Sequence, residues 1–98
     1  MITPDQLRDW FDYCPTTGAL YWRKGKGRAR PGAIAGSMRG DKQSPVWRIR
    51  LNNVFVSRAR VVWAWHHGEF PNKYVLHLNR NILDDRIENL TIDRPNRT

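Results

Sequence analysis

The residues best suited to chemistry include a basic, glycine-rich segment from Lys24 to Gly32. Its glycines would let backbone amides approach a phosphate group, and its cations would neutralise the phosphate charge. The segment lacks the spacing of a P-loop, so we expect a phosphodiester backbone as its ligand and not a nucleoside triphosphate. The candidate phosphate-binding side chains in it are Lys24, Lys26, Arg28 and Arg30.

A second basic feature is the stretch from Val46 to Leu51, in which apolar and basic residues alternate. Alternate side chains of a β-strand point to opposite faces. One face would therefore belong to the core, and the other would present Arg48 and Arg50 as a clamp on a nucleic-acid backbone. Arg58 is a further candidate contact. The residues expected on the core face are Trp47, Ile49 and Leu51.

The excess charge of the chain lies in the same region. The net charge is +8, and residues 21–60 carry eleven Lys or Arg against one Asp. A concentrated basic region is typical of a protein that binds nucleic acid, although a basic surface that only aids solubility is the alternative. No basic amphipathic helix, signal peptide or bilayer-length apolar run is apparent, so we expect no membrane partner.

The chain of 98 residues has room for one domain with one modest core. We expect a small α+β domain, with an N-terminal helix and basic β region in residues 1–57 and a helix plus β-hairpin in 58–98. A lone Cys14 excludes an internal disulfide, fits a reducing cytoplasmic compartment and is expected to be a small buried side chain.

Local signals predict the individual elements. A capping box of Thr3 and Gln6 starts a helix that should run to about Tyr13. Asn52-Asn53 should form a tight hairpin turn, because Asn tolerates positive φ. Ser57 and Gly68 should cap a helix over Arg58–His67. A polar loop over 79–89 should contain a helical turn near Asp84–Ile87. The expected strands are 19–23, 33–37, 46–51, 54–57, 74–78 and 90–93.

The segment Val75-Leu-His-Leu-Asn-Arg-Asn-Ile-Leu-Asp-Asp-Arg-Ile-Glu-Asn-Leu90 resembles the core of HNH (ββα-metal) endonucleases of phage and homing type. The resemblance extends upstream through Tyr13–Trp22, Gly32–Gly36 and Arg60–Pro71, in the order found in that family. It implies a phage-encoded protein that acts on duplex DNA in the cytoplasm of a bacterial host.

The resemblance also implies a mechanism. Enzymes of this family hydrolyse a phosphodiester with a His base and a divalent cation, Mg²⁺ or Mn²⁺. His77 corresponds to the base, and Asn89, twelve positions later, corresponds to the loop residue that orients it through backbone contacts.

Three departures from the family pattern imply a degenerate active site. The metal-binding Asp of the family falls at Leu76, which offers no oxygen to a hard cation. The His of a His-Arg pair falls at Ala59. The final metal-binding helix is expected to be truncated, which leaves Asn96 as the candidate for the last ligand. We therefore expect no metal site and no cofactor, unless the enzyme is active.

The adjacent carboxylates of the loop, Asp84 and Asp85, could recruit a cation. We interpret them as structural, with Asp84 as a turn cap and Asp85 as the partner of Arg86 or Arg80. Three functions remain open. The protein is a catalytically impaired relative that binds DNA through its basic surface, an active metal-dependent nicking enzyme that uses His77, or a protein-binding inhibitor of a host nucleic-acid enzyme.

Overall fold

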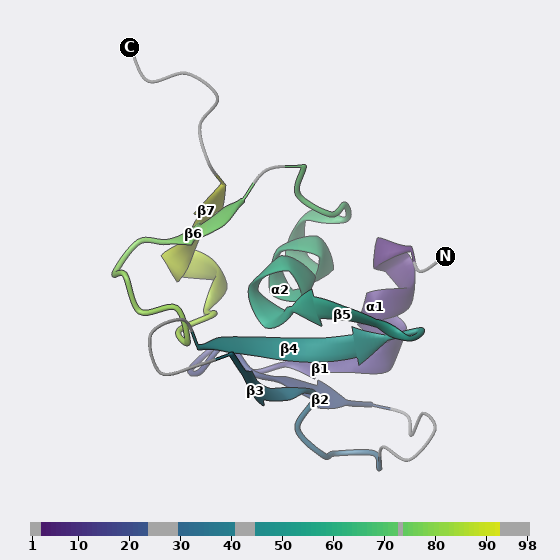
Figure 1. Ribbon diagram of the computed structural model, residues 1–98. Coiled ribbons are helices and arrows are strands. Elements are labelled where there is room, and N and C mark those ends of the chain that lie inside the picture. The colour runs from purple at the N-terminus through teal and green to yellow at the C-terminus, as the bar shows by residue number, and fades with distance from the viewer. Residues whose placement is uncertain (1–2, 24–29, 41–44, 73, 93–98) are drawn as a thin grey trace.

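The computed structural model describes residues 3–23, 30–40, 45–72 and 74–92. The expected α+β class, with short antiparallel strands and a central helix, is confirmed (Figure 1). In chain order the elements are α1 (Pro4–Trp10), β1 (Phe11–Tyr13), β2 (Leu20–Trp22), β3 (Ser37–Arg39), β4 (Val46–Leu51), β5 (Val54–Ser57), α2 (Arg58–His67), β6 (Val75–His77), the 3-10 helix η1 (Ile87–Asn89) and β7 (Leu90–Ile92).

The strands form a β1-β2 pair, a three-stranded β3-β4-β5 sheet and a β6-β7 pair, all antiparallel. Figure 1 shows α2 at the centre, with α1 on one side, β6 and β7 on the other, and β4 and β5 beneath it. Val61, Val62 and Ala64 of α2 are fully buried in the core that these elements enclose. No helix in the described ranges is long and apolar enough to cross a membrane.

Two local predictions are confirmed. Asn52 and Asn53 adopt φ values of 47° and 69° in the β4-β5 turn, as a tight hairpin requires. The Ser57 hydroxyl accepts a hydrogen bond from the Arg60 amide at 3.4 Å, and Gly68 ends α2 in the left-handed conformation. These turns fix the register of β4 and β5 and the direction in which α2 starts.

The predicted extent of the first helix is wrong. The helix ends at Trp10, and Phe11 begins a strand that pairs with β2. The reason is a tertiary contact. Phe11 is completely buried, and its ring centroid lies 4.6 Å from that of Trp22. Helical spacing of the aromatic residues is therefore a misleading signal in this segment.

Two other boundaries also differ from the prediction. The third strand covers Ser37–Arg39, whereas at Ile34 there is only an isolated bridge to Tyr21. The helical turn is η1, which lies later than expected, and the Ile87 amide at its start donates a hydrogen bond to the Tyr13 hydroxyl at 2.8 Å.

The β1-β2 turn packs closely against the segment before η1. At Gly18, a Cβ atom would lie 2.3 Å from the Arg86 backbone nitrogen, and the residue has a φ of +78°. Only glycine fits this contact. The N-terminal hairpin therefore supports the loop that carries the candidate functional residues.

Candidate functional site

The site is centred on His77, the last residue of β6. Strand alternation places Val75 and His77 on the same side of the hairpin, and both line one cavity. Leu76 points the other way and is 44% exposed. The pairing of His77 with Leu90 of β7 fixes the position of the imidazole.

Asp85 holds the imidazole in place. Its Oδ1 atom lies 2.6 Å from His77 Nε2, and its Oδ2 atom accepts a hydrogen bond from Arg58 Nε at 2.8 Å. The Asp85 side chain is 2% exposed and that of Arg58 is 6% exposed. The three side chains form a His77-Asp85-Arg58 array, in which one buried carboxylate is shared by an imidazole and a buried guanidinium.

Two predictions fail at this array. Asp85 was expected to pair with Arg86 or Arg80, but its partners are His77 and Arg58. Arg58 was expected to contact nucleic acid, but it is buried, donates to the Leu83 carbonyl at 3.0 Å and lies over the Trp47 ring. A residue that opens a helix can face either solvent or core, and here a buried carboxylate directs it inward.

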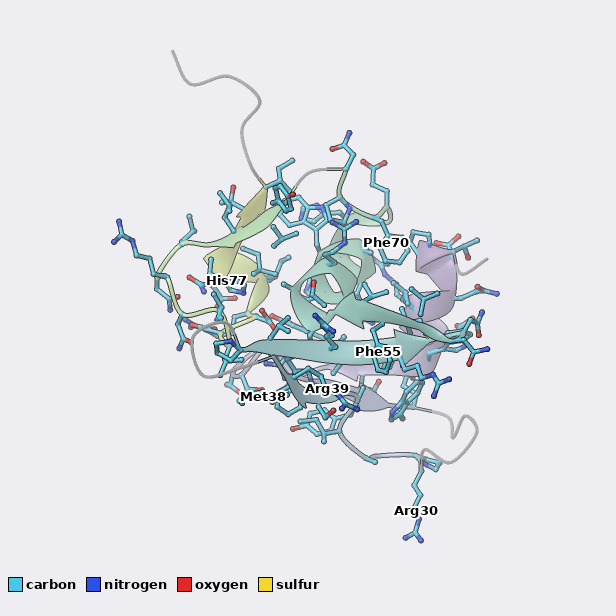
Figure 2. The ribbon with its side chains drawn as sticks, viewed as in Figure 1. Arg30, Met38, Arg39, Phe55, Phe70 and His77 are labelled. Carbon is cyan, nitrogen blue, oxygen red and sulfur yellow. The ribbon has the colours of Figure 1, made fainter. Side chains whose placement is uncertain are left out.

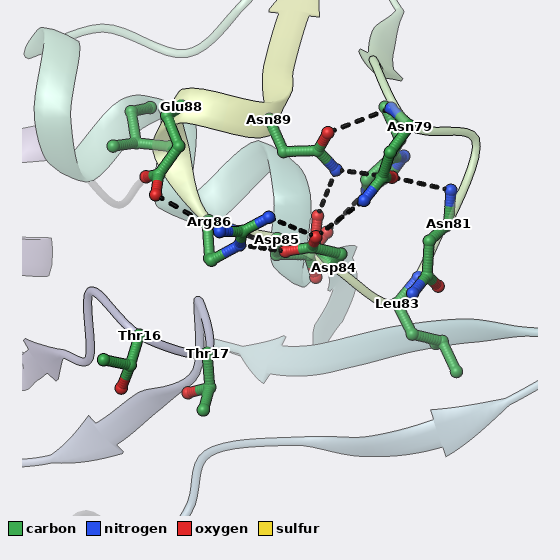
Figure 3. A network of polar contacts seen from close by, with 12 residues as sticks. Thr16, Thr17, Asn79, Asn81, Leu83, Asp84, Asp85, Arg86, Glu88 and Asn89 are labelled. Atoms are coloured by element: carbon green, nitrogen blue, oxygen red, sulfur yellow. Dashed lines mark hydrogen bonds and ion pairs between the residues drawn. The ribbon is translucent and has the colours of Figure 1, made fainter.

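The loop that follows His77 is held by an amide network, shown in Figure 3. Asn89 donates from Nδ2 to Asn79 Oδ1 and to the Asp84 carbonyl, both at 2.9 Å, and its Oδ1 atom accepts from the Asn79 amide. The Asn89 carbonyl also accepts from the Leu78 amide, at 2.8 Å. Within the described residues, Asn89 therefore bonds to the backbone and loop next to His77, and not to the imidazole.

Asp84 closes the same loop. Its carboxylate accepts hydrogen bonds from the Arg86 guanidinium and from Asn79 Nδ2, all at 2.8 Å. The guanidinium, with help from Asn79, holds the pKa of the Asp84 carboxyl well below its usual range. Asp84 also accepts from the Arg86 amide, at 3.4 Å, which agrees with its interpretation as a turn cap.

A cavity of about 230 Å³ opens beside the imidazole. His77 and Asp85 are its ionisable lining residues, and most of its remaining wall is apolar. Ala59 lies in that wall, at the position where the resemblance places a His. The other lining residues are Pro45, Val46, Trp47, Ser57, Val75 and Ile82.

The side chains around His77 do not fit a divalent cation. Both oxygens of Asp85 are engaged by the array, those of Asp84 by Arg86 and Asn79, and Leu76 offers no ligand atom. Among the residues that the structure describes, no three His, Cys, Asp or Glu side chains converge on one point. A hard cation needs several oxygen ligands, so this set of side chains does not support a metal-dependent step.

The outer face of the β3-β4-β5 sheet carries the basic surface. Arg48 and Arg50 are exposed on this face, and Ile49 and Leu51 are buried on the opposite one, as the alternation predicted. Register adds Arg39, which pairs with Val46 and so shares the outer face. In the described part of the chain, no carboxylate lies within ion-pair distance of these three arginines.

An aromatic ring lies among these arginines. Phe55 is opposite Arg50 in the β4-β5 pair and is 51% exposed. The guanidinium carbons of Arg39 and Arg50 lie 5.7 and 5.9 Å from its ring centroid. Sequence reasoning missed both Arg39 and Phe55. Counting the register back from the Asn52-Asn53 turn would have placed Phe55 beside Arg50.

The other basic residues predicted to bind nucleic acid do not lie on this face of the sheet or fall outside the described residues. Arg30 is exposed and projects away from the sheet (Figure 2). Lys24, Lys26 and Arg28 lie outside the described residues. The structure therefore brings Arg48 and Arg50 together with Arg39, but it does not place Arg30 or Arg58 among them.

Cys14 is not the buried residue that was expected. It is half-buried, and its sulfur lies 3.2 Å from the Thr16 hydroxyl at the start of the β1-β2 turn. Hydrogen bonds from Thr16 and Thr17 lower the pKa of the Cys14 thiol to about 7. Cys14 therefore contacts polar groups of the β1-β2 turn.

Residues 58–92 match the family model described as HNH endonuclease. The matched segment begins at Arg58, contains α2 and His77 and ends with β7. No curated protein and no solved structure matches the chain significantly. The segment from α2 to β7 is therefore similar to HNH endonucleases.

Proposed function

We propose that the protein binds DNA through the outer face of the β3-β4-β5 sheet, and that its HNH site is impaired in hydrolysis. The observation that carries this proposal is the shared face of Arg39, Arg48 and Arg50. Three guanidinium groups on one exposed surface suit a chain of phosphates, which supplies most of the affinity in sequence-independent DNA binding.

We infer the impairment from the oxygen atoms near His77 that could bind a metal ion. A nuclease of this type needs a metal ion to stabilise the leaving oxygen, and the carboxylates near the imidazole are already engaged by arginines. Loss of one electrostatic stabiliser typically lowers a rate by about 10²–10³. The protein would then retain the HNH scaffold as a DNA-binding domain, as expected for a phage-type relative that has lost its metal ligands.

Fluorescence anisotropy with a labelled duplex tests the binding. The affinity should fall steeply with salt, and Arg48→Ala/Arg50→Ala should reduce the slope of log K against log salt by about 1.8, at about 0.9 per lost phosphate contact. The control is Arg80→Asn, which removes an exposed cation from the loop after His77 and keeps a side chain that tolerates the φ of 64° there. Equal slopes for the wild type and the double variant would exclude the sheet as the DNA-binding face.

A second candidate, metal-dependent nicking by His77, is favoured by one observation. The carboxylate of Asp85 holds Nε2 at 2.6 Å, and a fixed imidazole could act as a base through Nδ1. Supercoiled plasmid incubated with Mg²⁺ or Mn²⁺ tests it. We expect no nicking by the wild-type protein, whereas nicking that His77→Ala abolishes would establish this second function in place of the impaired one.

The third hypothesis, inhibition of a host enzyme through a protein interface, drew on exposed tryptophans. All five tryptophans are half-buried, and Trp10, Trp22, Trp47, Trp63 and Trp65 pack against the core. No exposed tryptophan is thus available to anchor a partner protein.

A further inference from the structure

The second exposed feature of the sheet is a ring that phosphate binding does not require. Phe55 is half-exposed among arginines, on a face that would be expected to carry only polar side chains. Figure 2 shows Phe55, Arg39 and Met38 along the sheet, and His77 beside the β6-β7 hairpin. A partner that offers both a flat face and negative charge would suit a ring in that position.

The arginines around the ring are already arranged for such a partner. Arg39 belongs to β3, and β4 lies between it and β5, so its side chain extends across a whole strand to reach Phe55. Arg50 approaches the ring from the neighbouring position on β4. Cation–π attraction favours guanidinium groups within about 6 Å of a ring centroid, and it holds both cations beside the ring.

We infer that this face binds unpaired nucleic acid, with one base stacked on Phe55 and the phosphates on either side of that base bound by Arg39 and Arg50. The inference rests on the proposed function and specifies the form of nucleic acid. A base can stack on a protein ring only when its own face is free, and in a duplex both faces are covered by neighbouring base pairs. Arginines alone would suffice for the backbone of a duplex.

A second copy of the protein is a weaker explanation for the exposed ring. Two such faces would bring three arginines from each copy together, and this like-charge contact would oppose association. A single strand instead supplies one phosphate per base, so that each stacked base brings the charge that the arginines require.

The experiment compares a labelled oligothymidylate with a labelled duplex of the same length, by fluorescence anisotropy at low salt. Phe55→Leu keeps an apolar side chain and removes the π face. It should weaken binding of the single strand roughly five- to 150-fold and leave duplex binding unchanged. Phe55→Trp should bind the single strand at least as tightly as the wild type does.

The matched control is Tyr74→Leu, which removes an aromatic side chain that is 78% exposed and lies outside the sheet. It should change neither affinity, and far-UV circular dichroism should confirm that each variant is folded. If Phe55→Leu weakens both ligands equally, or weakens neither, the stacking inference is overturned. If Arg48→Ala/Arg50→Ala leaves both affinities unchanged, the proposed DNA-binding face itself is excluded, whatever the result at Phe55.

Discussion

Replacement of Asp85 by Asn should strongly destabilise the fold, because Asp85 is the only carboxylate that pairs with the buried Arg58 in the described residues. The guanidinium would keep its hydrogen bond to the Leu83 carbonyl and its position over the Trp47 ring. It would lose the negative charge at 2.8 Å that compensates its transfer out of water. The change keeps the shape of the side chain, so the loss of charge dominates.

The expected cost is about 3 kcal/mol, at the lower end of the ~3–5 kcal/mol that follows removal of one partner from a buried ion pair. The lower end applies because the Asn oxygen can still accept from Arg58. A domain of this size loses about 4–8 °C of melting temperature per kcal/mol, so the midpoint should fall by at least about 12 °C.

A double-mutant cycle with Arg58→Met separates the charge effect from packing. Urea unfolding of the wild type, of each single variant and of the double variant can be followed by tryptophan fluorescence. The double variant should be at least as stable as Asp85→Asn alone, because it contains no uncompensated guanidinium. Additive effects within about 0.5 kcal/mol, or a loss below about 1 kcal/mol for Asp85→Asn, would refute the reasoning.

Two further predictions concern the loop and its support. Asp84→Asn should lower the free energy of unfolding at neutral pH by at most about 1 kcal/mol, since the pair with arginine is partly exposed. Because the pKa of Asp84 is depressed in the folded state, this difference should disappear as the pH falls below about 4, and urea midpoints measured against pH check it. Gly68→Ala should lower the free energy of unfolding by about 1 kcal/mol, because the residue has a positive φ but its added Cβ would meet no other atom. Gly18→Ala should lower it more, because this residue also has a positive φ and its Cβ would meet backbone atoms. Equal urea midpoints for these two alanine variants would contradict that contact.

The parts of the fold that were predictable depend on local chemistry. The Asn52-Asn53 turn and the caps of α2 at Ser57 and Gly68 each act within a few residues of the sequence. The alternation in β4 assigned Arg48 and Arg50 to the solvent side correctly, because a strand with one buried face leaves little choice of register.

The parts that could not be predicted depend on contacts between distant residues. Asp85 lies 27 positions from Arg58, and nothing in the local sequence distinguishes this partner from the nearer Arg86 or Arg80. The end of the first helix was missed because the pairing of Phe11 with Trp22 outweighs helical spacing. Arg39 was not assigned to the basic face because the expected strand, 33–37, ends before it. Its place on that face follows from its pairing with Val46 of β4.

The contact between Tyr13 and Ile87 spans 74 positions and joins the first hairpin to the last part of the described chain. The Arg8 side chain similarly donates to the carbonyls of Trp65 and His66, 57 and 58 positions away. We expect such contacts to form late in folding, because a long loop must close before they contribute any stability. During synthesis the N-terminal hairpin would therefore leave the ribosome long before its partner, and the loop after His77 would become ordered only when both ends of the domain meet.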